Sequence, residues 1–392
     1  MLLEGLFHLS TWGYVIAALA MTHITIASVT IFLHRHQSHH ALSLNPVISH
    51  FFRFWLWLTT GMVTREWVAI HRKHHAKCET VEDPHSPKTR GLPIVFFWGA
   101  RLYRREAENL ETLEKYGQGT PDDRLERDLY ARNPTLGITL MAAVDLFLFG
   151  STGLIIFLVQ MLWIPLWAAG VINGIGHFWG YRNFETDDAS TNIIPWGILI
   201  GGEELHNNHH AHAASARLSS KWWEIDIGWW YIRTLAFFGL AKIRRLAPKV
   251  RTTEGKHIID VETARAIVKN RFHVMKLYGL KVVHPVISAE REGADRSMRV
   301  LFNRARKLMT REDIALVGGA RETLDKALQQ SQVLQTVYEF KQQLKEIWIK
   351  TSSNQAGRVK RLQAWCVEAE QTGIHALQDF ALFLRGYTIQ EA

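Results

Sequence analysis

The sequence predicts an all-α integral membrane protein, in which transmembrane helices support a cytoplasmic helical cap with a histidine-rich di-metal site, followed by a soluble α-helical module. Hydrophobic residues make up 47% of the 392-residue chain and are concentrated before about residue 240. Charged residues dominate after that point, and most of the 20 histidines lie in clusters before it. We therefore expect a membrane domain over residues 1–250 and a soluble C-terminal module over residues 251–392.

Composition limits the class of protein. The chain has two cysteines, Cys78 and Cys366, so we expect neither a disulfide framework nor a thiolate metal motif, and a reducing compartment fits. The net charge of +9 suits an anionic lipid surface, a phosphate-bearing substrate or nucleic acid, and charge alone does not choose among them. In the tail, basic residues are mixed with acidic ones, which is typical of a solvated surface, so we predict no nucleic-acid partner.

Two apolar stretches open the membrane domain. Residues 12–33 have the length of a membrane span, and no Lys or Arg precedes Arg35. By the positive-inside rule the N-terminus lies outside and Arg35 lies in the cytoplasm. Residues 46–62 are also apolar but carry Arg53 and lie between two histidine clusters. Because one crossing would separate these clusters, we expect an interfacial or re-entrant helix, with Arg53 reaching lipid head groups.

Two further stretches complete the domain. Residues 134–172 are apolar and interrupted by small residues at 150–153, which predicts a helical hairpin; Asp145 near its turn is either a cap or an intramembrane functional acid. Residues 222–240 are aromatic but carry Glu224, Asp226 and Arg233, which favours a helix along the interface. Three or four spans fit this pattern. With three spans, every histidine cluster falls on the cytoplasmic face of a multi-pass membrane protein.

The tail after residue 250 is predicted to be helical. Apolar residues recur at near-helical spacing over residues 322–350, which predicts an amphipathic helix. A polar break at residues 351–357 precedes another helix.

Four groups of histidines carry the chemistry. They lie at residues 34–40, at 71–75, at Asn173 with His177, and at 206–210. On an α-helix, residues i, i+3 and i+4 lie within a sector of about 100°, so an HxxHH segment presents three imidazoles to one point. The second and fourth groups both have this spacing. His34 and His39 are five residues apart, so they converge only if the helix ends or changes pitch between them.

The number of imidazoles indicates two metals. One pair, two triplets and His177 supply nine imidazoles, with His40 left undecided by the spacing, whereas a tetrahedral zinc takes about four. Imidazole suits Fe, Zn, Cu and Ni. Two redox metals in a partly apolar pocket suit O₂ activation, which can remove hydrogen from an unactivated methylene.

Other polar residues near the clusters have supporting or structural roles. His36 and His212 fall outside the ligand sector, and His85 is expected beside the site without ligating it. Three carboxylates either orient ligand histidines through their free N–H groups or form simple ion pairs: Glu66, Glu79 and Glu204.

The motifs occur in a fixed order over residues 10 to 240. They are His34-Arg35 with Ser38-His39, Glu66-Trp67, His71-Arg72-Lys73-His74-His75, Asp83-Pro84-His85, Asn173 with His177, Gly180-Tyr181-Arg182 and His206-Asn207-Asn208-His209-His210. This pattern resembles the membrane acyl-CoA (stearoyl-type, Δ9) fatty-acid desaturase family. The runs Arg65-Glu66-Trp67 and Gly201-Gly202-Glu203-Glu204-Leu205 are most similar to its bacterial members.

The resemblance implies a non-haem di-iron centre that uses O₂, and a bent acyl tunnel among the membrane helices. The implied ligands leave out His40, and Asn173 would hold an iron-bound water. The ligands are His34, His39, His71, His74, His75, His177, His206, His209 and His210. At a cytoplasmic site for the activated head group, Arg72, Lys73 and Arg182 are candidates to meet a coenzyme A phosphate.

The implied reaction inserts a cis double bond into a long-chain acyl thioester, with acyl-CoA and the Δ9 position as the leading choice. The tail has no haem-binding HPGG signature, so we expect a separate electron donor, a ferredoxin or a flavin reductase, at the bacterial inner membrane with lipid around the spans. Hydroxylation and oxidative decarboxylation would use the same site, and box spacing does not separate them. A histidine-rich metal transporter is an alternative of another class, but its ligands would lie inside the bilayer.

Overall fold

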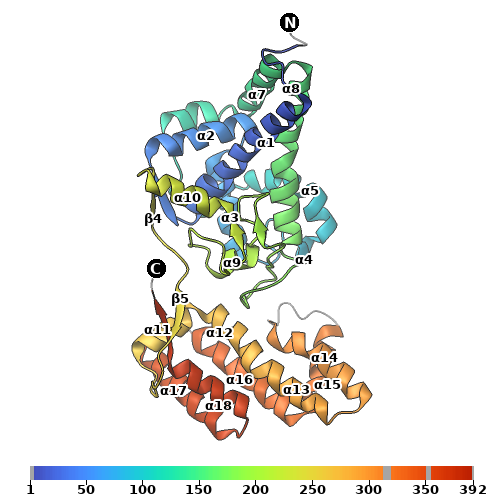
Figure 1. Cartoon of the computed structure of the whole chain (residues 1–392), viewed down its shortest axis with the longest axis vertical. Coiled ribbons are helices and arrows are strands. Elements are labelled where there is room, and N and C mark those ends of the chain that lie inside the picture. Colours follow the sequence, from blue (N-terminus) through green and yellow to red (C-terminus); the bar gives the residue numbers. More distant parts are fainter. Residues whose placement is uncertain (1–3, 312–318, 350–354, 391–392) are drawn as a thin grey trace. The chain divides into compact units, whose positions relative to one another are not determined.

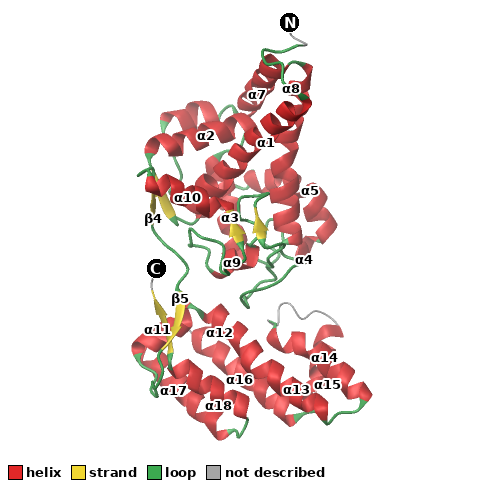
Figure 2. Cartoon of the chain, viewed as in Figure 1, coloured by secondary structure: helices red, strands yellow, loops and turns green. Residues whose placement is uncertain are grey.

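A computed structural model describes residues 4–311, 319–349 and 355–390, and these are mostly helical (Figures 1 and 2). The chain divides into two compact units. The N-terminal unit comprises Met1–Arg182 and Ala189–Ala247, and the second comprises Pro248–Ala392 together with the short segment Asn183–Asp188. We call Pro248–Ala392 the C-terminal module. Asn183–Asp188 lies far from it in sequence, and nothing in the sequence pattern predicted that the two belong together.

The first span is one continuous helix with two pitches. Helix α1 (Thr11–Ala27) begins at Ser10, whose Oγ accepts a hydrogen bond from Gly13 N. It passes without a break into π-helix η1 (Ser28–Ser38), in which every residue except His36 is buried. Together they form a helix long and apolar enough to cross a membrane, and it extends beyond the predicted end at residue 33.

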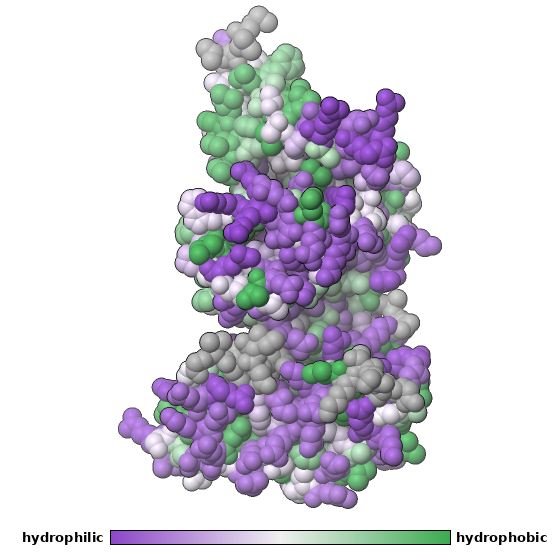
Figure 3. Space-filling model, turned by 180° about the vertical axis from the view of Figure 1, so that it is seen from behind, coloured by the Kyte–Doolittle hydropathy of each residue, from purple (hydrophilic) through white to green (hydrophobic). Residues whose placement is uncertain are grey.

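The predicted helical hairpin is present. Helix α7 (Pro134–Phe149) turns at Gly150 into α8 (Ser151–Ile164), which continues as π-helix η3 (Pro165–Ile175). The stretch 151–175 is a second helix long and apolar enough to cross a membrane, whereas α7 is shorter. Asp145 does not cap a helix, because it is buried and accepts a hydrogen bond from Gln160 Nε2 at 2.8 Å across the hairpin. Side chains exposed on these helices form an apolar surface (Figure 3).

Helix α2 (Pro46–Thr60) follows the first histidine group and begins at Asn45, whose side chain accepts from Val47 N. The expectation that Arg53 reaches lipid head groups is wrong. Its guanidinium is buried and lies 2.5 Å from Asp123 Oδ2, with Glu126 at 3.6 Å. Two carboxylates of the following polar region therefore neutralise this charge within the protein.

The remaining helices of the N-terminal unit surround the histidines. They are α3 (Thr64–Lys77), α4 (Pro87–Arg90), α5 (Leu92–Ala107), α6 (Leu110–Tyr116), η2 (Glu126–Tyr130), α9 (His206–Ala211) and α10 (Ile227–Phe237). Short strands depart from the all-α prediction. Strand β1 (Leu42–Leu44) pairs antiparallel with β4 (Ala241–Ile243), and β2 (Trp196–Gly197) pairs parallel with β3 (Ile225–Asp226).

The interfacial helix predicted over 222–240 is shorter than expected, because its acidic residues are not surface charges. Asp226 caps α10 by accepting from Trp229 N, and its carboxylate is buried against Arg35, with Nη2 and Oδ1 2.9 Å apart. Glu224 is also buried and accepts hydrogen bonds from Tyr181 and Asn208. These carboxylates tie the last part of the unit to the segments that carry the histidines.

The C-terminal module is a helical bundle with one apolar core (Figure 1). The helix predicted over 322–350 is divided at Gln330 and Ser331, and the polar break at 351–357 lies partly outside the described residues. Strand β5 (Lys249–Thr252) pairs antiparallel with β6 (Tyr387–Gln390). The helices are α11 (Val261–Lys269), α12 (Arg271–Tyr278), η4 (Gly279–Val283), α13 (His284–Glu292), α14 (Arg296–Thr310), α15 (Gly319–Gln329), α16 (Gln332–Ile349), α17 (Gln355–Gln371) and α18 (His375–Arg385).

Candidate metal centre

A change of helical pitch brings His34 and His39 together. The segment η1 is a π-helix, and at its end the backbone N–H of His39 bonds to the carbonyl of His34, five residues earlier, at 3.2 Å. Residues five apart therefore lie nearly above one another, as they do in a π-helix. The two imidazole ring centroids are 4.9 Å apart. The sequence left open whether the helix ends or changes pitch between His34 and His39. The structure shows both, since the helix has the π pitch here and η1 ends at Ser38.

Each HxxHH segment divides its histidines between two positions, which corrects the prediction that all three imidazoles meet at one point. On α3, His71 and His75 face one position, and His74 faces the other. On α9, His209 joins the first position, whereas the rings of His206 and His210 lie beside His177 at centroid distances of 4.8 Å each. Residues i and i+4 share a face and residue i+3 is turned aside, so one short helix serves two sites.

The first position is formed by five histidines whose candidate ligand atoms lie within 4.8 Å of one another: His34, His39, His71, His75 and His209. The Nε2 atom of His209 lies 3.0 Å from Nε2 of His34 and 2.8 Å from Nε2 of His75. Two nitrogens bound at right angles to one metal, each at about 2.1 Å, are about 3.0 Å apart. The observed spacing therefore fits a shared metal ion.

The second position is formed by His74, His177, His206 and His210, with the thiol of Cys78 nearby. Nε2 of His177 lies 2.9 Å from Nε2 of His206, which is again the spacing of neighbouring ligands on one metal. The ring of His210 lies 5.3 Å from that of His74 and 4.5 Å from that of His206. All nine predicted ligands thus fall into two adjacent groups.

Buried carboxylates hold three of these imidazoles by Nδ1, which leaves Nε2 for a metal. Glu203 Oε1 lies 2.7 Å from Nδ1 of His34, and Asp83 Oδ1 lies 3.0 Å from Nδ1 of His74. Glu79 Oε1 lies 3.0 Å from Nδ1 of His177. Hydrogen bonds of this kind fix the tautomer and the ring orientation of metal-ligating histidines.

The sequence identified one of these three carboxylates. Glu79 does contact a predicted ligand histidine, His177. The other two carboxylates in that prediction, Glu66 and Glu204, do not have this role. Glu204 accepts instead from the backbone N–H groups of Ile200 and Gly202, and burial raises the pKa of its carboxyl to about 7. Within the described residues, no contact joins Glu66 to a ligand histidine. Asp83 belongs to the Asp-Pro-His motif and Glu203 adjoins Glu204, so both could have been considered from the motifs that carry them.

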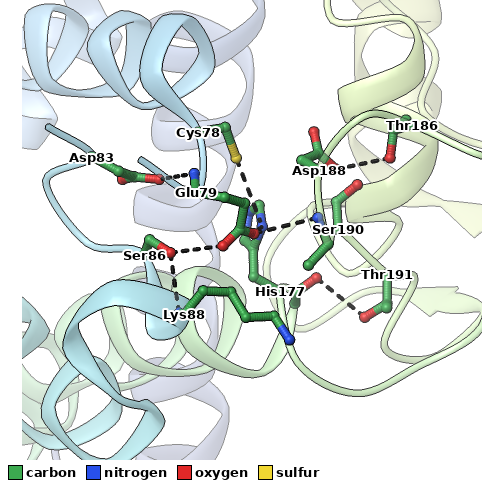
Figure 4. A network of polar contacts seen from close by, with 12 residues as sticks. Cys78, Glu79, Asp83, Ser86, Lys88, His177, Thr186, Asp188, Ser190 and Thr191 are labelled. Carbon is green, nitrogen blue, oxygen red and sulfur yellow. Dashed lines mark hydrogen bonds and ion pairs between the residues drawn. The ribbon is translucent and has the colours of Figure 1, made fainter. Parts of the chain in front are cut away.

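Glu79 is held in an unusual conformation by several partners (Figure 4). Its φ of 64° lies in the left-handed region, which residues other than glycine rarely adopt. Its backbone N–H donates to Asp83 Oδ2, its Oε2 accepts from Ser86 Oγ at 2.7 Å, and its Oε1 accepts from Ala189 N at 3.3 Å. The loop after α3 is therefore organised around the carboxylate that holds His177.

The electrostatics of the cluster favour neutral imidazoles. Burial, with repulsion from neighbouring histidines, holds the pKa values of His39, His71, His75 and His209 well below the ordinary value. Burial opposes ionisation of Asp83, but His74 and His85 hold the pKa of its carboxyl below its usual range. A neutral imidazole is the form that binds a metal, so the protein presents its ligands ready for binding.

The histidines expected not to ligate lie outside both groups. His36 lies 3.0 Å from the carbonyl of Leu42 through Nδ1, and His40 is exposed, with a φ of 50° and its Nε2 3.2 Å from Arg72. His85 stacks on His74 with ring centroids 4.4 Å apart and borders the cavity described next. The geometry therefore decides the position of His40, which the spacing had left open.

An apolar cavity of ≈130 Å³ adjoins both histidine groups. Its walls are formed by α5, α8 and η3, where small side chains such as Gly99, Ala100, Ala168 and Ala169 leave space. His34, His71 and His206 line the same cavity, as does Asn173. The two histidine groups and an apolar cavity thus share a wall.

The three basic residues predicted to meet a head group are engaged by the protein. Arg72 donates to the backbone carbonyls of Gln37, Ser38, Tyr116 and Gln118. Lys73 Nζ lies 2.7 Å from Glu106 Oε1, and Arg182 donates to the carbonyl of Ser190. Contact of Arg72, Lys73 or Arg182 with a substrate stays a prediction.

Comparison with known proteins agrees with this geometry. The family model described as fatty acid desaturase matches residues 10–251, which is more than half of the chain. The chain belongs to the fatty acid desaturase family. The matched residues contain all nine predicted ligand histidines and the three carboxylates that contact His34, His74 and His177.

Several proteins named as desaturases are similar to this chain. Delta-9 acyl-lipid desaturase 1 of Arabidopsis thaliana is 28% identical over 242 residues, covering 59% of this chain and 75% of the relative. Acyl-CoA 5-desaturase AL21 of Anemone leveillei is 31% identical over 227 residues, covering 55% and 66%. The sn-2 palmitoyl-lipid 9-desaturase of Nostoc sp. (strain 36) is 33% identical over 203 residues, covering 48% and 66%.

The C-terminal module is similar to a different protein family. A family model described as transposase matches residues 260–389, which is about a third of the chain. Among the module's described residues, no group of three or more metal-binding side chains lies close together. The desaturase family model ends at residue 251, so the module is an addition to the part that this family describes.

Proposed function

We propose that this desaturase inserts a cis double bond into a long-chain acyl thioester, with two iron ions held by the nine histidines and O₂ as co-substrate. The observation that carries the proposal is the pair of imidazole groups sharing a wall with an apolar cavity. Iron bound there supplies the oxidising power, drawn from O₂, to remove hydrogen from unactivated methylenes. The balanced reaction takes one O₂, two hydrogens from adjacent carbons, two electrons and two protons, and yields the double bond and two waters.

The chain's own residues position the partners of this reaction. Glu203, Asp83 and Glu79 direct Nε2 of His34, His74 and His177 toward the metals. The cavity walls exclude water and hold the acyl chain against His34, His71 and His206. Asn173 borders the same cavity, which supports its predicted role in holding a metal-bound water.

We propose acyl-CoA as the substrate and Δ9 as the position of the new double bond. Similar proteins include acyl-lipid 9-desaturases and an acyl-CoA 5-desaturase, so the head group and the position distinguish members of this family. Arg72, Lys73 and Arg182 are the proposed contacts for a coenzyme A phosphate. Since Arg72 also holds the carbonyls of Gln37 and Ser38, its replacement would disturb His39 as well, and Lys73 is the cleaner test.

We also propose a multi-pass arrangement in the bacterial inner membrane, with the metal centre on the cytoplasmic side. Two helices long and apolar enough to span a membrane, at 11–38 and 151–175, support it. Their ends at Ser38 and Ile175 both lie next to metal ligands, so the two ends meet at one centre. The reaction needs two electrons, which a separate donor such as a ferredoxin or a flavin reductase would supply.

Expression of the full chain in a host with profiled lipids tests the proposal. We expect new monounsaturated acyl chains from the wild type and none from His74→Ala, which removes a ligand of the second position. Hydroxy acids or terminal alkenes instead would show that the same centre performs hydroxylation or oxidative decarboxylation.

A further inference from the structure

The segment Asn183–Asp188 belongs to the same compact unit as the C-terminal module, although it lies between two parts of the desaturase unit in sequence. Glu185 N donates to the carbonyl of Phe272 on α12 at 3.1 Å, and its carboxylate lies 3.4 Å from Lys276 Nζ. Phe184 is only 7% exposed, and its ring lies 6.1 Å from that of His273. A backbone hydrogen bond, an ion pair and a buried aromatic ring thus hold this segment on one helix of the module.

Both ends of the segment are tied into the desaturase unit. Before it, Tyr181 bridges to Asn192 and Arg182 donates to the carbonyl of Ser190 at 2.9 Å. After it, Ala189 donates its backbone N–H to Oε1 of Glu79. The same oxygen lies 3.0 Å from Nδ1 of His177 (Figure 4). The segment that α12 holds therefore ends at Asp188, and the next residue, Ala189, donates to the carboxylate of Glu79 that contacts His177.

We infer that the C-terminal module is a positioning element of the metal centre. By holding Asn183–Asp188, helix α12 fixes Ala189, whose N–H orients Glu79 and, through it, His177. The inference rests on the proposed metal centre and assigns a role to the module that the desaturase family model does not include. It predicts coupling of the module to the second metal position and none to the first, whose histidines contact neither Glu79 nor Ala189.

The conformation of Glu79 makes such coupling effective. A left-handed conformation is strained for a residue other than glycine and persists only when its partners over-determine it. Ala189 N is one of those partners, with Ser86 and Asp83. If the segment detaches from α12, Ala189 gains conformational freedom and this donor is lost for part of the time. Loss of such outer contacts lowers metal affinity by about 10–100-fold in metal sites generally.

Titration of the metal-free full chain in detergent with Co²⁺ alone tests the inference, with ligand-field absorption reporting each site. The wild type should bind two Co²⁺ ions. Phe184→Ala and Lys276→Met should weaken one of them by about tenfold, leave the other unchanged and alter only one set of absorption bands. Phe184→Leu should restore most of the affinity because it keeps a buried apolar anchor. Lys256→Met removes the matched ion pair with Asp260, away from the segment, and should bind as the wild type does.

A double-mutant cycle with Glu79→Gln separates positioning from general damage. If α12 acts through Glu79, Lys276→Met should have no further effect on Co²⁺ affinity in the Glu79→Gln background. An additive effect, or full affinity and an unchanged spectrum in Phe184→Ala and Lys276→Met, would overturn the inference. Failure of the wild type to bind two Co²⁺ ions would instead contradict the proposed metal centre.

Discussion

Oε1 of Glu203 lies 2.7 Å from Nδ1 of His34, and it also accepts a hydrogen bond from Thr30 Oγ1 at 2.6 Å. One carboxylate thus joins two residues of η1 to the segment that precedes α9. Glu203→Gln keeps the size of this side chain and removes its charge. We expect it to lower metal affinity at the first position by about 10–100-fold, measured by competition with a chelator. Glu204→Gln, which changes an adjacent carboxylate without a histidine partner, should retain wild-type affinity.

The geometry predicts opposite outcomes for two adjacent histidines. His39→Ala removes one of the five imidazoles at the first position, so the purified protein should lose close to one iron per chain. His40→Ala should retain both irons, because His40 is exposed and lies outside both groups. Iron loss from His40→Ala with retention by His39→Ala would show that the register of η1 is wrong.

The buried pair of Arg35 and Asp226 should be important for stability. Asp226→Asn leaves the guanidinium without its counter-charge in a site where both side chains are at most 1% exposed. Breaking a buried ion pair in this way costs about 3–5 kcal/mol, which we expect as a large fall in the thermal midpoint in detergent. The exposed pair of Arg124 and Asp128 supplies the control, since Asp128→Asn should change the free energy of unfolding by less than about 1 kcal/mol.

The metal-free protein should lose stability in acid. The pKa values of His39, His71, His75 and His209 are lowered from 6.5 by burial, so below that pH the unfolded chain binds more protons than the folded chain does. Each histidine then lowers the free energy of unfolding by up to about 1.4 kcal/mol per pH unit. Chemical denaturation at a series of pH values measures the slope. A midpoint that does not change as pH falls through 6.5 would contradict neutral, buried imidazoles.

The cavity predicts a change in product length. Ala168→Phe fills space between α5 and η3 and should shift products toward shorter acyl chains, with iron content unchanged. Ala143→Phe places the same side chain on the exposed face of α7, away from the cavity, and should leave the product profile as in the wild type. Lipid profiling of the expressing host distinguishes them. Unchanged products from Ala168→Phe would mean that the acyl chain lies elsewhere.

The sequence predicted the elements whose signal is local. Apolar runs identified the first helix and the hairpin around Gly150. Histidine spacing identified the four groups but left His40 open, and the family resemblance supplied the set of nine residues that the structure brings together. The pitch of η1 could not be predicted, because an α-helix and a π-helix have the same apolar composition. Helix periodicity turns His74 aside from His71 and His75, but which histidines of other segments meet each of them depends on tertiary contacts that periodicity does not contain.

Charges were the main source of error, because a charge in the sequence does not show whether its partner is water or another side chain. Arg53 and Asp226 were expected near the membrane surface, yet each is buried against a residue distant in the sequence. Glu203 and Glu204 are both buried, but Glu203 lies against His34, whereas Glu204 accepts from the backbone N–H groups of Ile200 and Gly202. Such pairs follow from tertiary contacts.

X-ray absorption at the iron edge, combined with metal analysis of the purified wild-type chain, tests the central claim most directly. The account predicts two irons per chain, each surrounded by imidazole nitrogens at about 2.1 Å. A single metal per chain, or a spectrum without imidazole scattering, would contradict it.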